Sequence, residues 1–156
     1  MDPVALLIVL AHVALLAVGA WLIVIDIGTH RLPDRIVLPA LAAALLLAGA
    51  DALLSGGGAR LLGSLCGMLV LGGFYALLRL LSRNGMGGGD VKLAALIGLV
   101  LGWHGWQALV VGAAAAFVLG AVHALALIVT RRATGSTHIA FGPWMIVGAA
   151  LGVAAG

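Results

Sequence analysis

The sequence predicts an all-α, polytopic membrane protein built as a bundle of six transmembrane helices. Of its 156 residues, 64% are hydrophobic and 8% are charged, and the mean hydropathy of +1.28 lies far above that of soluble domains. The apolar residues form continuous runs, unlike the alternating segments of about ten residues in a membrane β-barrel. Six runs approach the roughly 20 residues that span a bilayer: 4–25, 36–54, 61–81, 91–102, 107–130 and 139–153. We expect one domain over residues 1–156.

The residues that precede the first two apolar runs indicate how each helix begins. No lysine or arginine precedes residues 4–25, so the basic region of a cleavable secretory signal is missing and a first spanning helix is expected. Pro33 and Asp34 precede the second run. Proline fits the first turn of a helix, and an acid there faces the positive end of the helix dipole. We therefore expect a structural role for Asp34.

The third run contains the single cysteine of the chain, Cys66. One cysteine excludes a disulfide framework or a CxxC zinc site within these residues. Because its neighbours are apolar, we expect Cys66 to behave as a small buried hydrophobic residue.

The fourth run is too short to cross a bilayer alone. Residues 91–102 would form a helix only about 18 Å long, whereas the hydrocarbon core is about 30 Å thick. Either the glycine-rich loop 85–89 dips into the membrane, or the bundle is thin there and admits water. Both alternatives place Asp90 below the membrane surface, in a cavity open to the cytoplasm.

Glycine is abundant, with 24 residues. Several glycines lie four residues apart within the predicted helices: Gly63 with Gly67, Gly98 with Gly102, and Gly148 with Gly152. Such spacing lets membrane helices approach closely. We expect these glycines to serve helix packing and not catalysis.

The basic residues predict the orientation of the bundle. Six helices place seven of the eight on one side: Arg31, Arg35, Arg79, Arg83, Lys92, Arg131 and Arg132, with Arg60 alone on the other. By the positive-inside rule that side is the cytoplasm, so both termini are expected outside. These scattered bases, despite a net charge of +3, do not form the clustered face of a nucleic-acid-binding protein.

The chain has only five acidic residues, all aspartates, so the candidates for acid catalysis can be considered one by one. Asp26 ends the first predicted helix and Asp90 begins the fourth, at the same predicted membrane face. Asp2 lies at the outer terminus and Asp51 near the outer end of the second helix, so neither is expected to meet Asp90. The sequence therefore nominates Asp26 and Asp90 as a pair.

Two carboxyl groups that face each other in a partly dry cavity cannot easily both ionise, so they share one proton. Aspartyl-protease chemistry needs this arrangement, because one acid accepts a proton from water while the other donates to the peptide carbonyl. The glycines before Asp90, Gly87, Gly88 and Gly89, permit backbone shapes closed to other residues and leave room for an extended substrate.

Two other kinds of site fit the sequence poorly. A phosphate-binding loop requires GxxxxGK[ST], but here Asp90 stands between the glycines and Lys92, and Leu93 follows. Lys92 instead suits a helix end anchored at lipid headgroups. The histidines, at positions 12, 30, 104, 123 and 138, show no metal-ligand spacing, so we expect interface or hydrogen-bonded roles, with His30 and His138 as candidates to border an active site. Trp103, Trp106 and Trp144 resemble interfacial anchors.

Three segments resemble the signatures of the type IV prepilin peptidases, the GxGD aspartyl proteases of bacterial inner membranes. They are residues 26–34 (DIGTHRLPD), 85–93 (GMGGGDVKL) and 139–143 (IAFGP). The resemblance covers nearly the whole chain and keeps the order of the family signatures. It implies that Asp26 and Asp90 are the catalytic pair, which the topology argument selected independently.

The resemblance also implies a substrate and a location. The substrate would be a prepilin or pseudopilin precursor, cut on the cytoplasmic side after a glycine, between a short basic leader and an apolar helix. Gly87, Gly88 and Gly89 would form the active-site loop. The segment residues Lys92, Phe141, Gly142 and Pro143 are substrate-binding candidates. We expect membrane lipid as a neighbour, no nucleic acid, and no metal or organic cofactor, in a protein of pilus or type II secretion systems.

The sequence departs from the family in two places. Longer members carry an N-terminal extension with paired CxxC motifs and also N-methylate the product, so we do not expect methylation by this chain. Ala140 stands where proline is common. Two other functions remain open: a small proton-coupled transporter subunit that uses Asp26 and Asp90 as proton sites, and a non-catalytic assembly protein of a pilus or secretion apparatus.

Overall fold

A computed structural model describes residues 3–82, 86–131 and 140–156. Its helices are α1 (Pro3–Thr29), α2 (Asp34–Ser55), α3 (Gly58–Leu81), α4 (Gly88–His104), α5 (Trp106–Val129) and α6 (Gly142–Ala155). These described ranges contain no strand. The all-α prediction and the six expected helices are therefore confirmed.

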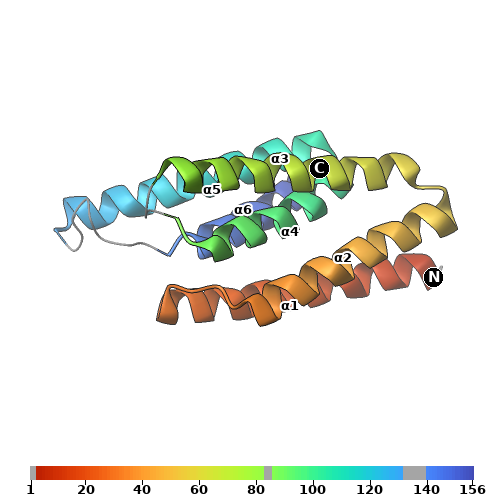
Figure 1. Ribbon diagram of the computed structural model, residues 1–156, viewed down its shortest axis with the longest axis horizontal. Coiled ribbons are helices and arrows are strands. Elements are labelled where there is room, and N and C mark those ends of the chain that lie inside the picture. Colours follow the sequence, from red (N-terminus) through yellow and green to blue (C-terminus); the bar gives the residue numbers. More distant parts are fainter. Residues whose placement is uncertain (1–2, 83–85, 132–139) are drawn as a thin grey trace.

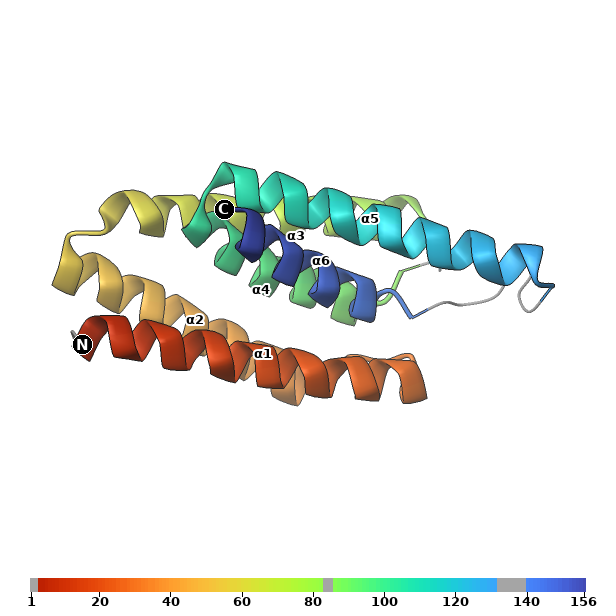
Figure 2. The same ribbon diagram turned by 180° about the vertical axis from the view of Figure 1, so that it is seen from behind.

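The helices form three layers of two (Figures 1 and 2). α1 and α2 lie along one side of the molecule, α3 and α5 along the other, and α4 and α6 lie between these pairs. α4 packs chiefly against α3 and also contacts α2, α5 and α6. Eight of its 17 residues are buried, the largest such set among the helices.

Four helices, α1, α2, α3 and α5, are long and apolar enough to cross a membrane. α4 and α6 are shorter, with 17 and 14 residues, or about 26 Å and 21 Å. Both short helices belong to the middle layer, where neighbouring protein surrounds them. Large apolar side chains remain exposed on the outer helices, including Val24 at 70% and Leu53 at 89%. The chain is thus a multi-pass membrane protein whose outer apolar surface suits lipid.

The prediction for the fourth helix was wrong in its length. α4 contains 17 residues and begins at Gly88, whereas the apolar run predicted twelve residues from Val91. Gly88 and Gly89 are helical, so this part of the glycine-rich segment is not an irregular loop. The hydropathy argument placed the start of the helix after the charged residue Asp90. A helix begins where its backbone can be capped, and here Gly87 and Asp90 provide that cap.

The glycine pairs pack helices as expected. A Cβ on Gly63 would lie 2.6 Å from the carbonyl oxygen of Gly102, and Gly67 and Gly98 contact each other's backbone in the same way. Since only hydrogen atoms separate these backbones, α3 and α4 approach closely. In α6, a Cβ on Gly148 would lie 2.6 Å from the Gly112 carbonyl oxygen of α5. Close packing of the middle layer, α4 and α6, against α3 and α5 depends on these glycines.

Cys66 was expected to be buried, and that prediction was wrong. Its side chain is exposed, because the buried stripe of α3 runs through Ser64, Gly67, Leu71 and Tyr75. Cys66 lies off this stripe, on the outer face of the helix. The apolar neighbours that suggested burial in protein are equally suited to lipid.

Candidate active site

Three helix ends that carry the signature residues meet at one end of the bundle, which we call the Asp26 end. α1 finishes there at Thr29, α4 begins at Gly88 and α6 begins at Gly142, and both ribbon views show these ends on the same side of the molecule (Figures 1 and 2). The connection between α2 and α3 lies at the opposite end, which we call the Asp51 end. The fold therefore gathers segments that are far apart in sequence.

Asp26 lies in the last turn of α1 and is only 4% exposed. Its Oδ2 accepts a hydrogen bond from the backbone N–H of Gly142, the first residue of α6, at 3.1 Å. A Cβ at position 142 would collide with that same oxygen. Gly142, a substrate-binding candidate in the sequence, therefore contacts the acid directly, and its missing side chain makes the contact possible.

Asp90 is the third residue of α4 and is partly buried. Its Oδ2 accepts a hydrogen bond from the backbone N–H of Gly87 at 3.1 Å, as an acid does at this position of a capping box. The positive end of the α4 dipole also favours a carboxylate here. The Asp90 carboxyl group is near enough to that of Asp26 for the two charges to interact, and its charge also reaches the Tyr75 hydroxyl group. The two nominated acids are thus electrostatic neighbours.

Leu32 contacts the starts of both α4 and α6, and sequence reasoning missed it. It belongs to the connection between α1 and α2 and is 8% exposed. Its Cβ lies 2.7 Å from the place where a Cβ on Gly89 would stand, and its Cδ1 lies 3.6 Å from the corresponding place at Gly142. An apolar residue inside the signature 26–34 thus packs the start of α4 against the start of α6.

The glycines before Asp90 serve close packing, which corrects the sequence-based explanation. Gly87 has φ −70°, a value open to any residue, and Gly88 and Gly89 are helical. A Cβ on Gly88 would collide with the Arg79 guanidinium, and one on Gly89 would collide with Leu32. The space beside these glycines is therefore occupied by protein side chains.

Phe141 joins an aromatic cluster under the start of α6. Its ring centroid lies 5.5 Å from that of Phe117 on α5 and 6.1 Å from that of Tyr75 on α3. Tyr75 is 1% exposed and was not singled out from the sequence. Pro143 is buried in the first turn of α6, where proline is favoured. These contacts fix the position of Gly142, and hence of its hydrogen bond to Asp26.

Lys92 forms an ion pair with Asp34, with 2.5 Å between Nζ and Oδ2. Asp34 stands in the first turn of α2, as expected. The pair links the starts of α2 and α4 at the Asp26 end and gives Lys92 a protein partner in addition to the headgroup contact predicted for it. Both side chains are substantially exposed, so the pair contributes little stability.

His30 borders the site. It follows α1 directly, has a left-handed φ of 51°, and donates its backbone N–H to the Asp26 carbonyl oxygen at 2.8 Å. His138, the other histidine considered, lies outside the described residues. Within the described ranges, no group of three histidine, cysteine or acidic side chains could hold a metal ion.

Three other histidines have the hydrogen-bonded and interface roles predicted for them. At the Asp51 end, the Nε2 atoms of His12 and His104 share a hydrogen bond of 2.9 Å. Because His12 Nδ1 also lies 2.7 Å from the Ile8 carbonyl oxygen, which only accepts, Nδ1 carries a proton. His123 on α5 packs against Trp144 on α6, with their ring centroids 4.9 Å apart. Trp144 is therefore a helix-packing residue as well as an anchor candidate.

Both nominated acids fall in the stretch that matches a known family. A family model described as "Type IV leader peptidase family" matches residues 13–125, which is most of the chain. The chain belongs to this family. The match includes the segments of Asp26 and Asp90 and ends before the third signature at residues 139–143.

Curated relatives agree with the family assignment. A protein named "Prepilin leader peptidase/N-methyltransferase" from Aeromonas salmonicida is 36% identical over 136 residues, covering 81% of this chain and 44% of the relative. Proteins of the same name from Dickeya chrysanthemi and Bacillus subtilis are 38% and 36% identical, covering 90% and 82% of this chain and 49% and 48% of each relative. The chain spans about half the length of these relatives. No solved structure matches it.

Proposed function

We propose that this chain is an aspartic endopeptidase that removes the short basic leader of type IV prepilins or pseudopilins, with Asp26 and Asp90 as the catalytic pair. One observation carries the proposal: two acids from different helices lie at the same end of the bundle, one of them buried, within range of each other's charge. Membership of the leader peptidase family supports the reaction class. Proximity of two carboxyl groups supports the assignment of the pair.

The reaction requires one carboxylate and one carboxylic acid. The carboxylate accepts a proton from a water molecule while the water oxygen attacks the scissile carbonyl carbon. The carboxylic acid donates its proton to the carbonyl oxygen, which gives a tetrahedral diol. When the diol collapses, the C–N bond breaks, the leaving nitrogen gains a proton, and a new carboxyl and a new amino terminus result. The pair returns to its starting protonation.

Orientation in the membrane follows from charge. Most basic residues flank the Asp26 end, which the positive-inside rule assigns to the cytoplasm of a bacterial inner membrane. The precursor would lie with its apolar helix in the bilayer and its leader at this end. Cleavage would then fall after the glycine that precedes the apolar helix, and both termini of the described bundle would face outward.

Co-expression with a prepilin tests the proposal. Asp26→Asn and Asp90→Asn keep the size of each side chain and remove its acid function, so each should abolish leader removal, seen as an unshifted precursor band. Asp34→Asn makes the same change to an acid at the same end that pairs with Lys92, and it should largely preserve cleavage. Normal processing in either of the first two variants would disprove the catalytic pair.

The same variants separate peptidase from transporter. A proton-coupled transporter predicts acid-dependent flux in liposomes that contain only this protein. We expect no such flux from the wild-type chain, and cleavage of a prepilin reconstituted into the same liposomes. Flux that disappears in both asparagine variants, together with intact precursor, would favour the transporter.

A further inference from the structure

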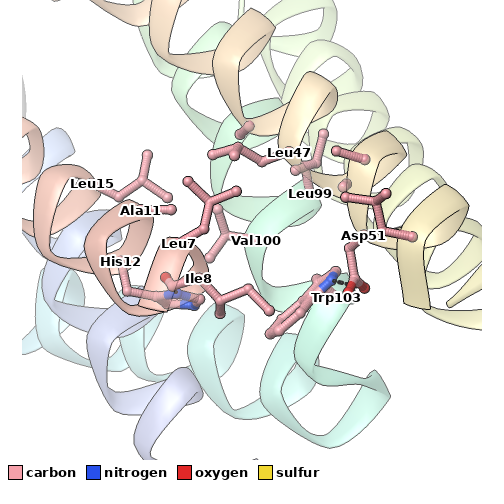
Figure 3. A pocket seen from close by; sticks show the side chains of 14 residues that line it. Leu7, Ile8, Ala11, His12, Leu15, Leu47, Asp51, Leu99, Val100 and Trp103 are labelled. Carbon is pink, nitrogen blue, oxygen red and sulfur yellow. Dashed lines mark hydrogen bonds between the residues drawn. The ribbon is translucent and has the colours of Figure 1, made fainter. Parts of the chain in front are cut away.

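A cavity of about 70 Å³ opens between α1, α2 and α4 toward the Asp51 end (Figure 3). Its walls are almost entirely apolar, and the leucines Leu7, Leu15, Leu47 and Leu54 are among them. Leu7 is 46% and Leu54 72% exposed, so the cavity opens at the outer surface of the bundle. It is several times larger than the space one water needs, and it lies at the other end of the molecule from Asp26.

The polar edge of the cavity is formed by Asp51, one turn before the end of α2. Its Oδ2 accepts hydrogen bonds from Arg60 Nη1 at 3.2 Å and from Trp103 Nε1 at 3.3 Å, the latter visible in Figure 3. Asp51 is 6% exposed, and its Oδ1 has no hydrogen-bond partner within the described residues. A buried carboxylate oxygen without a donor is costly, so this end of the cavity favours a ligand that supplies one.

Neighbouring side chains direct no N–H to Oδ1 within the described residues. Trp103 has one N–H, which Oδ2 already receives. His12 also lines the cavity, but its two ring nitrogens are engaged with Ile8 and His104. The Arg60 guanidinium lies over the Trp103 ring at 5.4 Å and directs one of its five N–H groups to Oδ2. Its side chain is 50% exposed, so positive charge faces outward beside the buried acid.

These features fit a zwitterionic lipid. We propose that the cavity binds one acyl chain of a phospholipid with a primary ammonium headgroup, phosphatidylethanolamine, whose ammonium donates to Asp51 Oδ1 and whose phosphate pairs with Arg60. A transmembrane helix is about 10 Å wide with its side chains and is too wide for this cavity, whereas part of a narrow, flexible acyl chain can enter it from the lipid side. An adjacent acid and base match a headgroup that carries a cation beside an anion. The proposal is independent of the peptidase function.

Lipid titration of the purified wild-type chain, followed by native mass spectrometry, tests the proposal without any mutation. Phosphatidylethanolamine, phosphatidylcholine and phosphatidylglycerol are added with identical acyl chains. Phosphatidylcholine has the same charges but no N–H on its trimethylated nitrogen, so its first binding event should be about tenfold weaker. Phosphatidylglycerol has no ammonium and should also bind more weakly. Equal binding of all three, or preference for either of the others, would overturn the proposal.

Two variants locate the site. Asp51→Asn should reduce the preference for phosphatidylethanolamine over phosphatidylcholine at least fivefold, while Asp34→Asn, an exposed acid at the opposite end, should leave it unchanged. Ala11→Phe fills the cavity from α1 and should remove the first binding event for all three lipids. Circular dichroism checks that each variant is folded. An unaltered preference in folded Asp51→Asn, or unaltered binding in folded Ala11→Phe, would exclude this cavity; if Asp51→Asn unfolds, the lipid comparison and Ala11→Phe decide.

Discussion

The two ends of the bundle each bury an aspartate and satisfy it differently. At one end, Asp26 accepts a hydrogen bond from a backbone N–H and lies near a second acid, Asp90. At the other, Asp51 forms an ion pair with Arg60 and accepts from an indole N–H. A neighbouring cation stabilises the ionised form of an acid, whereas a neighbouring acid opposes it. The first environment suits proton transfer, and the second suits a structural ion pair that joins α2 to α3.

Glycine accompanies the acid at both ends. A Cβ on Gly142 would collide with Asp26 Oδ2, and a Cβ on Gly57 would stand 2.8 Å from Asp51 Oδ2. In each case the missing side chain lets the backbone cover the carboxylate. The comparison therefore isolates the partner charge as the main difference between the two environments.

The largest expected effect is on prepilin cleavage, and it distinguishes the two buried acids, Asp26 and Asp51. Asp26→Asn should reduce prepilin cleavage at least about 100-fold, the scale of general acid–base catalysis, with little change in thermal stability because no positive charge is left unpaired. Asp51→Asn should destabilise the protein by about 1 to 3 kcal/mol, because it removes the charged partner of Arg60. Cleavage rate and unfolding temperature, measured on both variants in the same detergent, check this. Equal loss of stability in both would contradict the comparison.

A smaller effect is expected from the glycines beside the acids. Gly142→Ala should displace the Asp26 carboxylate and lower the cleavage rate about 10- to 100-fold, because misplacement by about 1 Å can cost a factor of 100. Gly57→Ala should instead lower the unfolding temperature, because it disturbs Asp51.

Gly73→Ala is the matched control for both, since nothing lies within 4 Å of its added methyl group. It should preserve cleavage, and it should leave stability unchanged or raise it by up to about 1 kcal/mol, as alanine favours helix. A Gly142→Ala variant that behaves like Gly73→Ala would show that the contact to Asp26 does not position the acid.

A third effect, expected on stability alone, distinguishes two adjacent glycines at the Asp26 end. Gly89→Ala should destabilise the protein by about 1 to 3 kcal/mol, because its methyl group meets Leu32 Cβ at 2.7 Å and the Leu32 carbonyl oxygen at 3.2 Å. Gly88→Ala meets the flexible end of Arg79, which can rotate away, so its effect should be within about 0.5 kcal/mol. Thermal unfolding compares the two, and equal destabilisation would contradict the packing explanation.

Several properties of this protein follow from its sequence alone. Hydropathy and composition predicted an all-α membrane protein with six helices, and the structure confirms that fold. The spacing of glycines such as Gly63 and Gly67 predicted close helix packing, which the α3–α4 contact confirms. The signature segments predicted the family, which the family match confirms. Charge bias nominated Asp26 and Asp90, whose catalytic roles remain a prediction.

Only the tertiary structure decided which helices lie inside the bundle and what each side chain touches. It buried the short α4 between other helices, exposed Cys66, joined Lys92 to Asp34, and set Leu32 against the starts of α4 and α6. It also left one buried oxygen of Asp51, a residue that lines an apolar cavity, without a hydrogen-bond partner among the described residues. Hydropathy is a local property that is summed along the chain, and it marks each of these helices as apolar without saying which neighbours it has. Lateral packing joins residues far apart in sequence, so it follows from shape complementarity between whole helices, and chain order alone does not fix it.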